Sequence, residues 1–575
     1  MRATAQGAVV VASVLGLVLA GVAPAAGAAA TTPTPEQVTE RTGAVGASEN
    51  APPDPETDQL GWEAGYWYNE TLPVTTDDGL NRTELRAYVA RTAARVERIR
   101  QLEFERIPTV NLVTRDEYTA SIDRRFANVS VSTPQRLHQN TKFEALFFVG
   151  EQESYFQVQR QNQAGSVAAF YARQPLPRVG VGEGEIAIIT GDTSENTTQV
   201  FSPSLLAHEL THAAQGQNFP TALNVTGDTE EATRANLSLI EGDAEYVEQT
   251  YNQRCGTAFD CLSANSTGGA GNIANWGLAI YGLAAYGNTG AFVGHIIETR
   301  GYETLNGFYR GEDRPVSTEQ YIHPDRYPDD TPQTVTVEDR SNEEWNVLEL
   351  PNSTVEHATF GEAGVFSMLW YPTRQRGEEV IVPLINETSN PLVGFNFARE
   401  PSTGWDGDKL YPYVNESSAA TNETGYVWKL VWDSPEDARE FADAYRQLLE
   451  FYGAQPARGA DDAYVISPEG FGPGTKFADA FALTVEDDTV VIVNAPTLSD
   501  LNEVRAGTVP EDARPPTPTP SALDTETPTP TASPTPTPTE TDAATATPGQ
   551  PGLGVVTALV ALVLALTALV AGRWR

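Results

Sequence analysis

Apolar and proline-rich segments at the two ends of the chain leave only its middle for a globular fold. Of the 575 residues, 1–30 contain Arg2, then an apolar run, then the small-residue stretch Ala26-Gly27-Ala28. This order is typical of a secretory signal peptide, and the short run disfavours the alternative, a permanent membrane helix. Residues 31–58 are polar and proline-rich, so we expect a linker there. The folded body is therefore expected within residues 59–508.

The C-terminal end predicts a stalk and a membrane segment. Residues 509–550 are rich in threonine and proline, a composition that stays extended and offers hydroxyl groups for O-glycosylation. Residues 551–575 contain an apolar run of about 20 residues, which is enough to span a bilayer as a helix. Arg573 and Arg575 follow this run, and positive charge stays on the cytoplasmic side. We therefore expect the body outside the cell, anchored at its surface.

The charge of the chain excludes nucleic acids as partners. Its 77 acidic residues outnumber 37 basic ones, which gives a net charge of −40. Such a surface repels phosphate groups. An acid excess with very few lysines is typical of extreme halophiles, because high salt screens the self-repulsion. A merely acidic surface protein is the alternative.

The two cysteines and the sequons fit an exported glycoprotein. In an exported chain, Cys255 and Cys261 in CGTAFDC are expected to close a small disulfide loop, with two free thiols as the alternative. So many N-x-[ST] sequons indicate glycosylation, although a buried helix would make it unlikely at Asn236. The sequons lie at Asn69, Asn81, Asn128, Asn196, Asn224, Asn236, Asn265, Asn352, Asn386, Asn415 and Asn422.

Hydrophobic periodicity predicts an α+β fold in two domains, 59–335 and 336–508, separated by a polar hinge near 330–345. In the second domain, Ser434 and Pro435 predict the start of a helix, as a capping residue and a first-turn proline. This smaller domain shows no cluster of catalytic residue types, so we expect a packing or recognition role for it. The other expected elements are a helix over 85–102, strands over 107–114, 183–190 and 426–433, a strand or buried turn over 145–150, a helix from 204, helical structure over 275–301, and a hairpin over 481–494.

The segment His208-Glu209-Leu210-Thr211-His212 predicts a metal centre. Spacing of four on a helix places both imidazoles on one face, where they can converge on one Zn²⁺, and Glu209 can act on a metal-bound water. Ser202 and Pro203 favour a helix start just before it. Two histidines that merely pack on a helix are the alternative.

A catalytic zinc ion needs a third protein ligand and an open position for water. No histidine lies between residues 213 and 294, but Glu241 and Glu245 lie four apart in EGDAEY. We expect Glu241 to bind the metal and Glu245 to contact the far nitrogen of a ligating histidine from outside the ligand set. Glu245 could itself be the ligand, and a solvated acidic helix face is the further alternative.

The chain contains three motifs in order, HELTHAAQGQNF, EGDAEY and PVSTEQYIHPDRY. Together they resemble the gluzincin class of zinc metallopeptidases. The resemblance is closest to secreted members with HELTHALQDQHF, EGDA and P-x-STEQ-x-x-HP-x-x-Y. The resemblance covers about 200–330 and implies a zincin-like domain. It implies His208, His212 and Glu241 as zinc ligands and Glu209 as the general base. Because gluzincins commonly use a His or Tyr at the oxyanion, it also suggests His323 as a catalytic residue, with a structural histidine in a loop as the alternative. Asn218 stands where relatives often have His, at a position that is not a ligand.

The tail carries a second resemblance. Pro551-Gly552-Leu553, the apolar run and the basic end are similar to the archaeal sorting signal processed by archaeosortases, with Leu553 in place of Phe. The tail is therefore either kept as a membrane anchor or replaced by lipid. Together with the signal, stalk and motifs, this tail resembles haloarchaeal surface glycoproteins.

The expected function is hydrolysis of protein or peptide substrates at the cell surface. An extended substrate would add to the edge of the strand at 183–190 by analogy with the family. The alternative is a catalytically inactive surface glycoprotein with a structural or vestigial zinc site, acting in adhesion or envelope architecture. A weaker alternative is binding of extracellular ligands through residues 336–508.

Overall fold

The computed structural model describes residues 53–517, apart from 75, 77, 128–129, 191–199, 224, 226, 265–272, 351–355, 385–389 and 470–472. The expected signal peptide, most of the expected linker and stalk, and the expected membrane segment lie outside this part of the chain. Among the described helices, none is long and apolar enough to cross a membrane.

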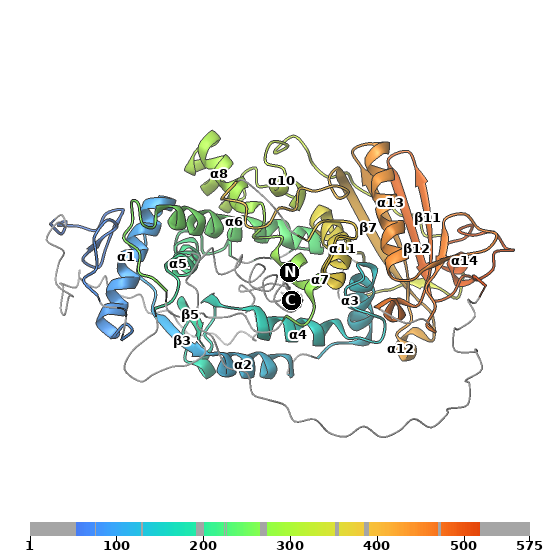
Figure 1. The fold of residues 1–575 in the computed structure, drawn as a ribbon, viewed down its shortest axis with the longest axis horizontal. Helices are drawn as coiled ribbons and strands as arrows, with labels where there is room; N and C mark the ends of the chain where they lie inside the picture. The colour runs from blue at the N-terminus through green and yellow to red at the C-terminus, as the bar shows by residue number, and fades with distance from the viewer. Residues whose placement is uncertain are drawn as a thin grey trace, which may run out of the picture.

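Mixed helices and strands confirm the expected α+β class. The helices are α1 (Arg82–Arg100), α2 (Arg115–Ala127), α3 (Thr133–Ala145), α4 (Tyr155–Ser166), α5 (Pro203–Asn218), α6 (Glu230–Arg254), α7 (Trp276–Leu283), α8 (Thr289–Arg300), α9 (Tyr302–Tyr309), α10 (Thr318–Ile322), α11 (Gly361–Arg376), α12 (Ser418–Thr421), α13 (Pro435–Phe451) and α14 (Asp500–Val504). The strands are β1 (Trp62–Glu63), β2 (Tyr66–Trp67), β3 (Val110–Thr114), β4 (Ala169–Ala172), β5 (Glu185–Thr190), β6 (Asn346–Val347), β7 (Trp405–Val414), β8 (Gly425–Trp432), β9 (Gln455–Pro456), β10 (Ala463–Val465), β11 (Ala480–Glu486) and β12 (Thr489–Ala495). Figure 1 shows α1, α5, α6, β3 and β5 toward one end of an elongated molecule, and β7, β11, β12 and α13 toward the other.

The first sheet has the order β3-β5-β4 and lies beside α5. Strand β5 pairs in parallel with β3 and antiparallel with β4, so both of its edges are occupied. The expectation that residues 183–190 offer a free edge to a substrate is therefore wrong. Helix α5 packs against β4 and β5, with Leu206 and Leu210 fully buried. The edge strand next to α5 is β4.

Helices α5 and α6 begin at side-chain caps and pack against each other. Ser202 Oγ accepts a hydrogen bond from the Leu205 N–H, and Pro203 occupies the first turn of α5, as expected. Thr229 caps α6 by accepting from the Ala232 N–H. These two caps fix where the helices that carry the candidate metal ligands start.

The second sheet is antiparallel, with the order β6-β7-β8-β12-β11-β10-β9. Strand β8 confirms the strand expected at 426–433, and β11 with β12 confirms the expected hairpin. The expected cap of α13 is also confirmed, because the Glu436 and Asp437 N–H groups donate hydrogen bonds to Ser434 Oγ. Elsewhere residues 145–150 form a buried turn, the strand expected at 107–114 begins only at Val110, and 275–301 divides into α7 and α8.

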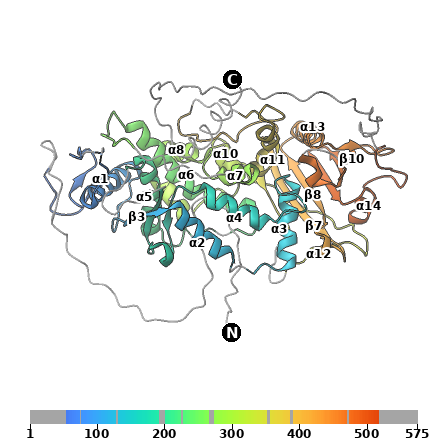
Figure 2. The same cartoon turned by 60° about the horizontal axis from the view of Figure 1, so that its bottom comes forward.

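The largest hydrophobic core joins residues from both sides of the expected domain boundary. It includes Phe148 and Tyr281 from the first part, and Phe366, Trp428 and Phe441 from the second. Figure 2 shows α3 and α11 beside β7 and β8, and α3 contacts both strands while α11 contacts β7. The division at 335/336 stays a prediction, but burial of this core ties the sheet to the helices of the first part.

Candidate metal centre

His208, His212 and Glu241 meet at the packed faces of α5 and α6. The Nε2 atoms of His208 and His212 each lie 3.4 Å from Glu241 Oε2. The two imidazole rings are 4.8 Å apart and nearly perpendicular. All three side chains are buried. The structure thus brings together the three residues expected to bind a metal, and the group could hold a metal ion.

The donor set and its spacing fit zinc. Ligand atoms at 2.0–2.1 Å from one tetrahedral zinc ion lie about 3.3–3.4 Å from each other, which matches both nitrogen–oxygen distances. The buried carboxylate of Glu241 faces the two imidazole nitrogens and the Tyr286 hydroxyl group, and no lysine or arginine pairs with it among the described residues. A buried carboxylate in this state is costly unless a charge offsets it, so a cation between these atoms would satisfy the site.

In the metal-free protein, the pKa values of Glu241 and His208 shift in opposite directions. Burial raises the pKa of Glu241, but His212 and then His208 outweigh it and bring this pKa down to about 2. Burial lowers the pKa of His208, but hydrogen bonding to Glu241 and Glu248 outweighs it and raises the pKa well above its usual value. A proton on His208 therefore occupies part of the place that a cation would take.

Glu209 lies on α5 between the two histidines. The residue is 5% exposed, and Oε2 has no hydrogen-bond partner among the described residues. Burial raises the pKa of Glu209, although the charges of His212 and His208 oppose the rise. A carboxylate with a raised pKa and an unused oxygen can accept a proton and return it.

The far nitrogens of the imidazoles face Glu248 and Gln215. His208 Nδ1 lies 3.1 Å from Glu248 Oε2, and His212 Nδ1 lies 2.9 Å from Gln215 Oε1. The atom at hydrogen-bonding distance from His208 thus belongs to Glu248, not to the expected Glu245. Glu245 lies close to both His208 and Glu248, and it accepts a hydrogen bond from Gln249. In the sequence, Glu248 lies seven residues after Glu241, on the same face of α6 as Glu241 and Glu245. Nothing else in the sequence distinguished it.

A second layer of buried polar groups supports Gln215. Its Nε2 donates to Tyr309 Oη at 3.0 Å, and Tyr309 donates to Asp243 Oδ2 at 2.8 Å. Arg100 of α1 pairs with Asp243 at 2.6 Å, and both side chains are fully buried. No sequence pattern had marked these residues as part of the site, although Asp243 lies inside the EGDA motif. The chain of contacts fixes Gln215, and through it the ring of His212.

Tyr286 is a further residue beside the candidate ligands. Its ring stacks on His208 with centroids 6.0 Å apart. Burial, and then the charge of Glu241 and a hydrogen bond to it, raise the pKa of Tyr286 well above its usual value. Its hydroxyl group therefore stays protonated beside the candidate ligands. No local sequence pattern marks Tyr286, which lies just after α7.

His323 lies in a different group of charges. Its Nε2 is 3.0 Å from Glu362 Oε1 of α11. Nearby, one nitrogen of Arg326 pairs with Glu319, Asp330 and Asp433, so these three carboxylates already share a cation. Among the described residues, no ion pair or hydrogen bond joins His323 to His208, His212 or Glu241. The catalytic role of His323 stays a prediction without a contact to support it.

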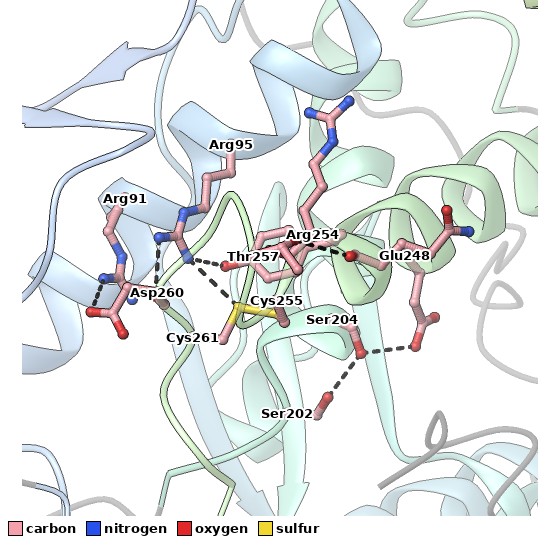
Figure 3. The surroundings of a disulfide bond; sticks show 12 residues. Arg91, Arg95, Ser202, Ser204, Glu248, Arg254, Cys255, Thr257, Asp260 and Cys261 are labelled. Atoms are coloured by element: carbon pink, nitrogen blue, oxygen red, sulfur yellow. Dashed lines mark hydrogen bonds and ion pairs between the residues drawn. A yellow bond between two sulfur atoms is a disulfide. The ribbon is translucent and has the colours of Figure 1, made fainter. Parts of the chain in front are cut away.

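The expected disulfide between Cys255 and Cys261 is present. Figure 3 shows it at the end of α6, near the Ser202–Ser204–Glu248 contacts. Ser204 Oγ donates to Glu248 Oε1 at 3.2 Å. Cys255 follows the last residue of α6 as its C-cap, so the disulfide closes a loop at the end of the helix that carries Glu241 and Glu248.

The described sequons differ in how their asparagines are placed. Asn236 is half-buried within α6, which supports the expectation that glycosylation is unfavourable there. Asn81 caps α1 by accepting from two backbone N–H groups. Asn422 donates to the Glu151 carbonyl oxygen. Attachment of a glycan would require the Asn422 amide to leave that contact.

Part of the chain matches a known protein family. Residues 348–505 match a family model described as a domain of unknown function (DUF8575). This segment contains most of the antiparallel sheet, whereas the candidate metal centre lies outside it. Neither a curated protein nor a solved structure matches the chain.

Proposed function

We propose that this protein is an extracellular zinc metallopeptidase with a zincin-like catalytic part, held at the cell surface by its C-terminal segment. The observation that carries the proposal is the pair of 3.4 Å distances from Glu241 Oε2 to the two imidazoles, with Glu209 beside them. His208, His212 and Glu241 would hold the zinc ion. This set leaves one tetrahedral position for water, as in catalytic zinc sites.

The chain supplies the acid–base and positioning groups. When bound, zinc would supply Lewis acidity toward a water molecule and a peptide carbonyl group. Glu209 would take a proton from the water and deliver it to the leaving amine. Glu248 and Gln215 would hold the imidazoles in the orientation that directs both Nε2 atoms toward Glu241.

The surroundings also suggest how a substrate reaches the centre. An extended peptide can add to an exposed sheet edge, and β4 is the edge strand that packs against α5. Tyr286 would place a neutral hydroxyl group near the reacting carbonyl. Glycosylation, a saline habitat, membrane or lipid attachment and archaeosortase processing belong to this proposal and rest on the sequence alone.

The proposal is tested by comparing Glu209→Gln with wild type in molar salt. Glu209 contributes no ligand atom, so the variant should keep its zinc, measured by metal analysis, while cleavage of casein or a peptide library falls at least a hundredfold. Glu298→Gln, an exposed change on α8, serves as the matched control and should keep full activity.

His208→Ala should lose both zinc and activity. Unchanged cleavage by Glu209→Gln would remove Glu209 from the mechanism. Bound zinc without any turnover in the wild type would instead support the inactive surface glycoprotein.

A further inference from the structure

Three arginines of α1 are completely buried, in a chain that has few bases. Arg91, Arg95 and Arg100 each have a relative exposure of 0%. A guanidinium cannot lose its charge at neutral pH and is rarely buried without a partner. Each of the three therefore needs acceptors for its N–H groups and a compensating charge.

Arg100 and Arg95 have partners that account for their burial. Arg100 pairs with Asp243. Arg95 donates to the Tyr68 carbonyl oxygen at 2.7 Å, to Tyr251 Oη at 2.8 Å and to the Asp260 carbonyl oxygen at 3.0 Å. These acceptors are neutral, and Arg95 has no ion pair among the described residues.

Arg91 lies one turn earlier and is poorly satisfied. Nη1 donates to the Glu70 carbonyl oxygen at 3.2 Å, whereas Nε and Nη2 have no partner among the described residues. The paired carboxylate is that of Asp260, 3.9 Å from Nη1 with a side chain that is 52% exposed. Figure 3 shows Arg91 and Arg95 extending from α1 toward Asp260 and the disulfide loop. Burial and then Arg95 lower the pKa of Arg91 to about 10, so Arg91 remains charged at neutral pH.

We propose that the Nε–H and Nη2–H groups of Arg91 bind a small monovalent anion, chloride. These two groups form one side of the guanidinium fork and point in the same direction, which suits a single acceptor. Among the described residues, the carboxylate paired with these two arginines is the half-exposed one of Asp260, so their two positive charges are only partly compensated there. Sulfate or phosphate would bring more charge and more acceptor atoms than the two free donors can satisfy.

The bound anion would join α1 to the loop that the disulfide closes. Asp260 lies in that loop, and Arg95 bonds to its backbone and to Tyr251 of α6. An anion here would stabilise the packing of α1 against the end of α6. The inference stands on Arg91 and its surroundings and does not depend on zinc or on peptidase activity.

Chloride replacement in the full-length protein tests the site. Urea unfolding is followed while sodium chloride is exchanged for sodium gluconate at constant ionic strength. If chloride binds one site that exists only in the folded state, chloride concentrations above its dissociation constant should stabilise the protein. The folding equilibrium constant should then rise about tenfold for each tenfold rise in chloride concentration. Arg91→Gln should lose this dependence. Arg98→Gln, exposed on the same helix, should retain it.

Bromide provides a second test that needs no variant. Crystals of the wild-type protein grown in sodium bromide should show an anomalous peak within hydrogen-bonding distance of Arg91 Nε and Nη2. Equal stability in chloride and gluconate, or no peak, would overturn the proposal.

Discussion

Removing the carboxylate of Asp243 should destabilise the protein far more than a single hydrogen bond would. In Asp243→Asn the charge that compensates Arg100 disappears, while Arg100 stays fully buried. Asp243 also accepts from Tyr309 Oη at 2.8 Å, in addition to its contact with Arg100 at 2.6 Å. Removing one partner of a buried ion pair costs about 3–5 kcal/mol, because the other charge is left unpaired. We expect a loss of this size in the free energy of unfolding.

Urea titration at fixed molar salt measures this loss, since urea leaves the ionic strength unchanged. Asp228→Asn provides the control, because Asp228 is exposed just before α6 and its change should stay within about 0.5 kcal/mol. The double variant Arg100→Met/Asp243→Leu should recover part of the loss, because no unpaired charge remains. A loss below about 1 kcal/mol for Asp243→Asn would refute the argument that Arg100 depends on this carboxylate.

The same variant should weaken metal binding. Asp243 and Tyr309 hold Gln215, whose Oε1 lies 2.9 Å from His212 Nδ1. Loss of such outer contacts typically costs 10–100-fold in metal affinity. Competition with a chelator, performed where the variant is still folded, separates this effect from the loss of stability. Unchanged affinity would show that Gln215 keeps its place without Asp243.

Three further predictions concern the centre and the helix packing around it. Glu248→Ala should lower zinc affinity about 10–100-fold in chelator competition, because it removes the group facing His208 Nδ1. The pKa of His208 is raised in the metal-free protein, so zinc must displace a proton when it binds. The apparent zinc affinity should therefore rise with pH and level off above the pKa of His208. A zinc affinity that stays constant between about pH 5 and 8 would contradict this prediction. Gly242→Ala places a Cβ 2.7 Å from Thr289 Cβ in α8 and should cost about 1–3 kcal/mol in urea unfolding by separating α8 from α6.

Local features of the chain were predictable from sequence. The caps at Ser202 and Ser434 and the hairpin of β11 and β12 depend on neighbouring residues, and each occurs where it was expected. The facing imidazoles of His208 and His212 are likewise a consequence of helix geometry. Features that one helix or one turn determines can be derived from a single segment.

Features set by packing between segments were not predictable. Glu241, Glu245 and Glu248 share one face of α6, and only the way in which α5 crosses α6 decides which acid meets His208 Nδ1. Strand β5 has the pattern of any buried strand, and its central position follows from pairing with β4, which no local signal indicated. The resemblance to gluzincins suggested a catalytic role for His323, but the partner of His323 is Glu362, from a helix beyond the expected hinge.

The distribution of charge around α6 gives an argument for a divalent ion that does not use the motif. Asp243 has Arg100 as its counter-ion, whereas Glu241, Glu245 and Glu248 have no lysine or arginine paired with them among the described residues. Burial and then Glu248 raise the pKa of Glu245 to about 8, which is how a carboxyl group responds when nearby positive charge is insufficient. Without a metal ion, His208 offsets part of this acidity by holding a proton, because its pKa is raised well above the usual value. A divalent cation held by His208, His212 and Glu241 would offset the acidity without that proton, so metal-free protein should release it as zinc is added.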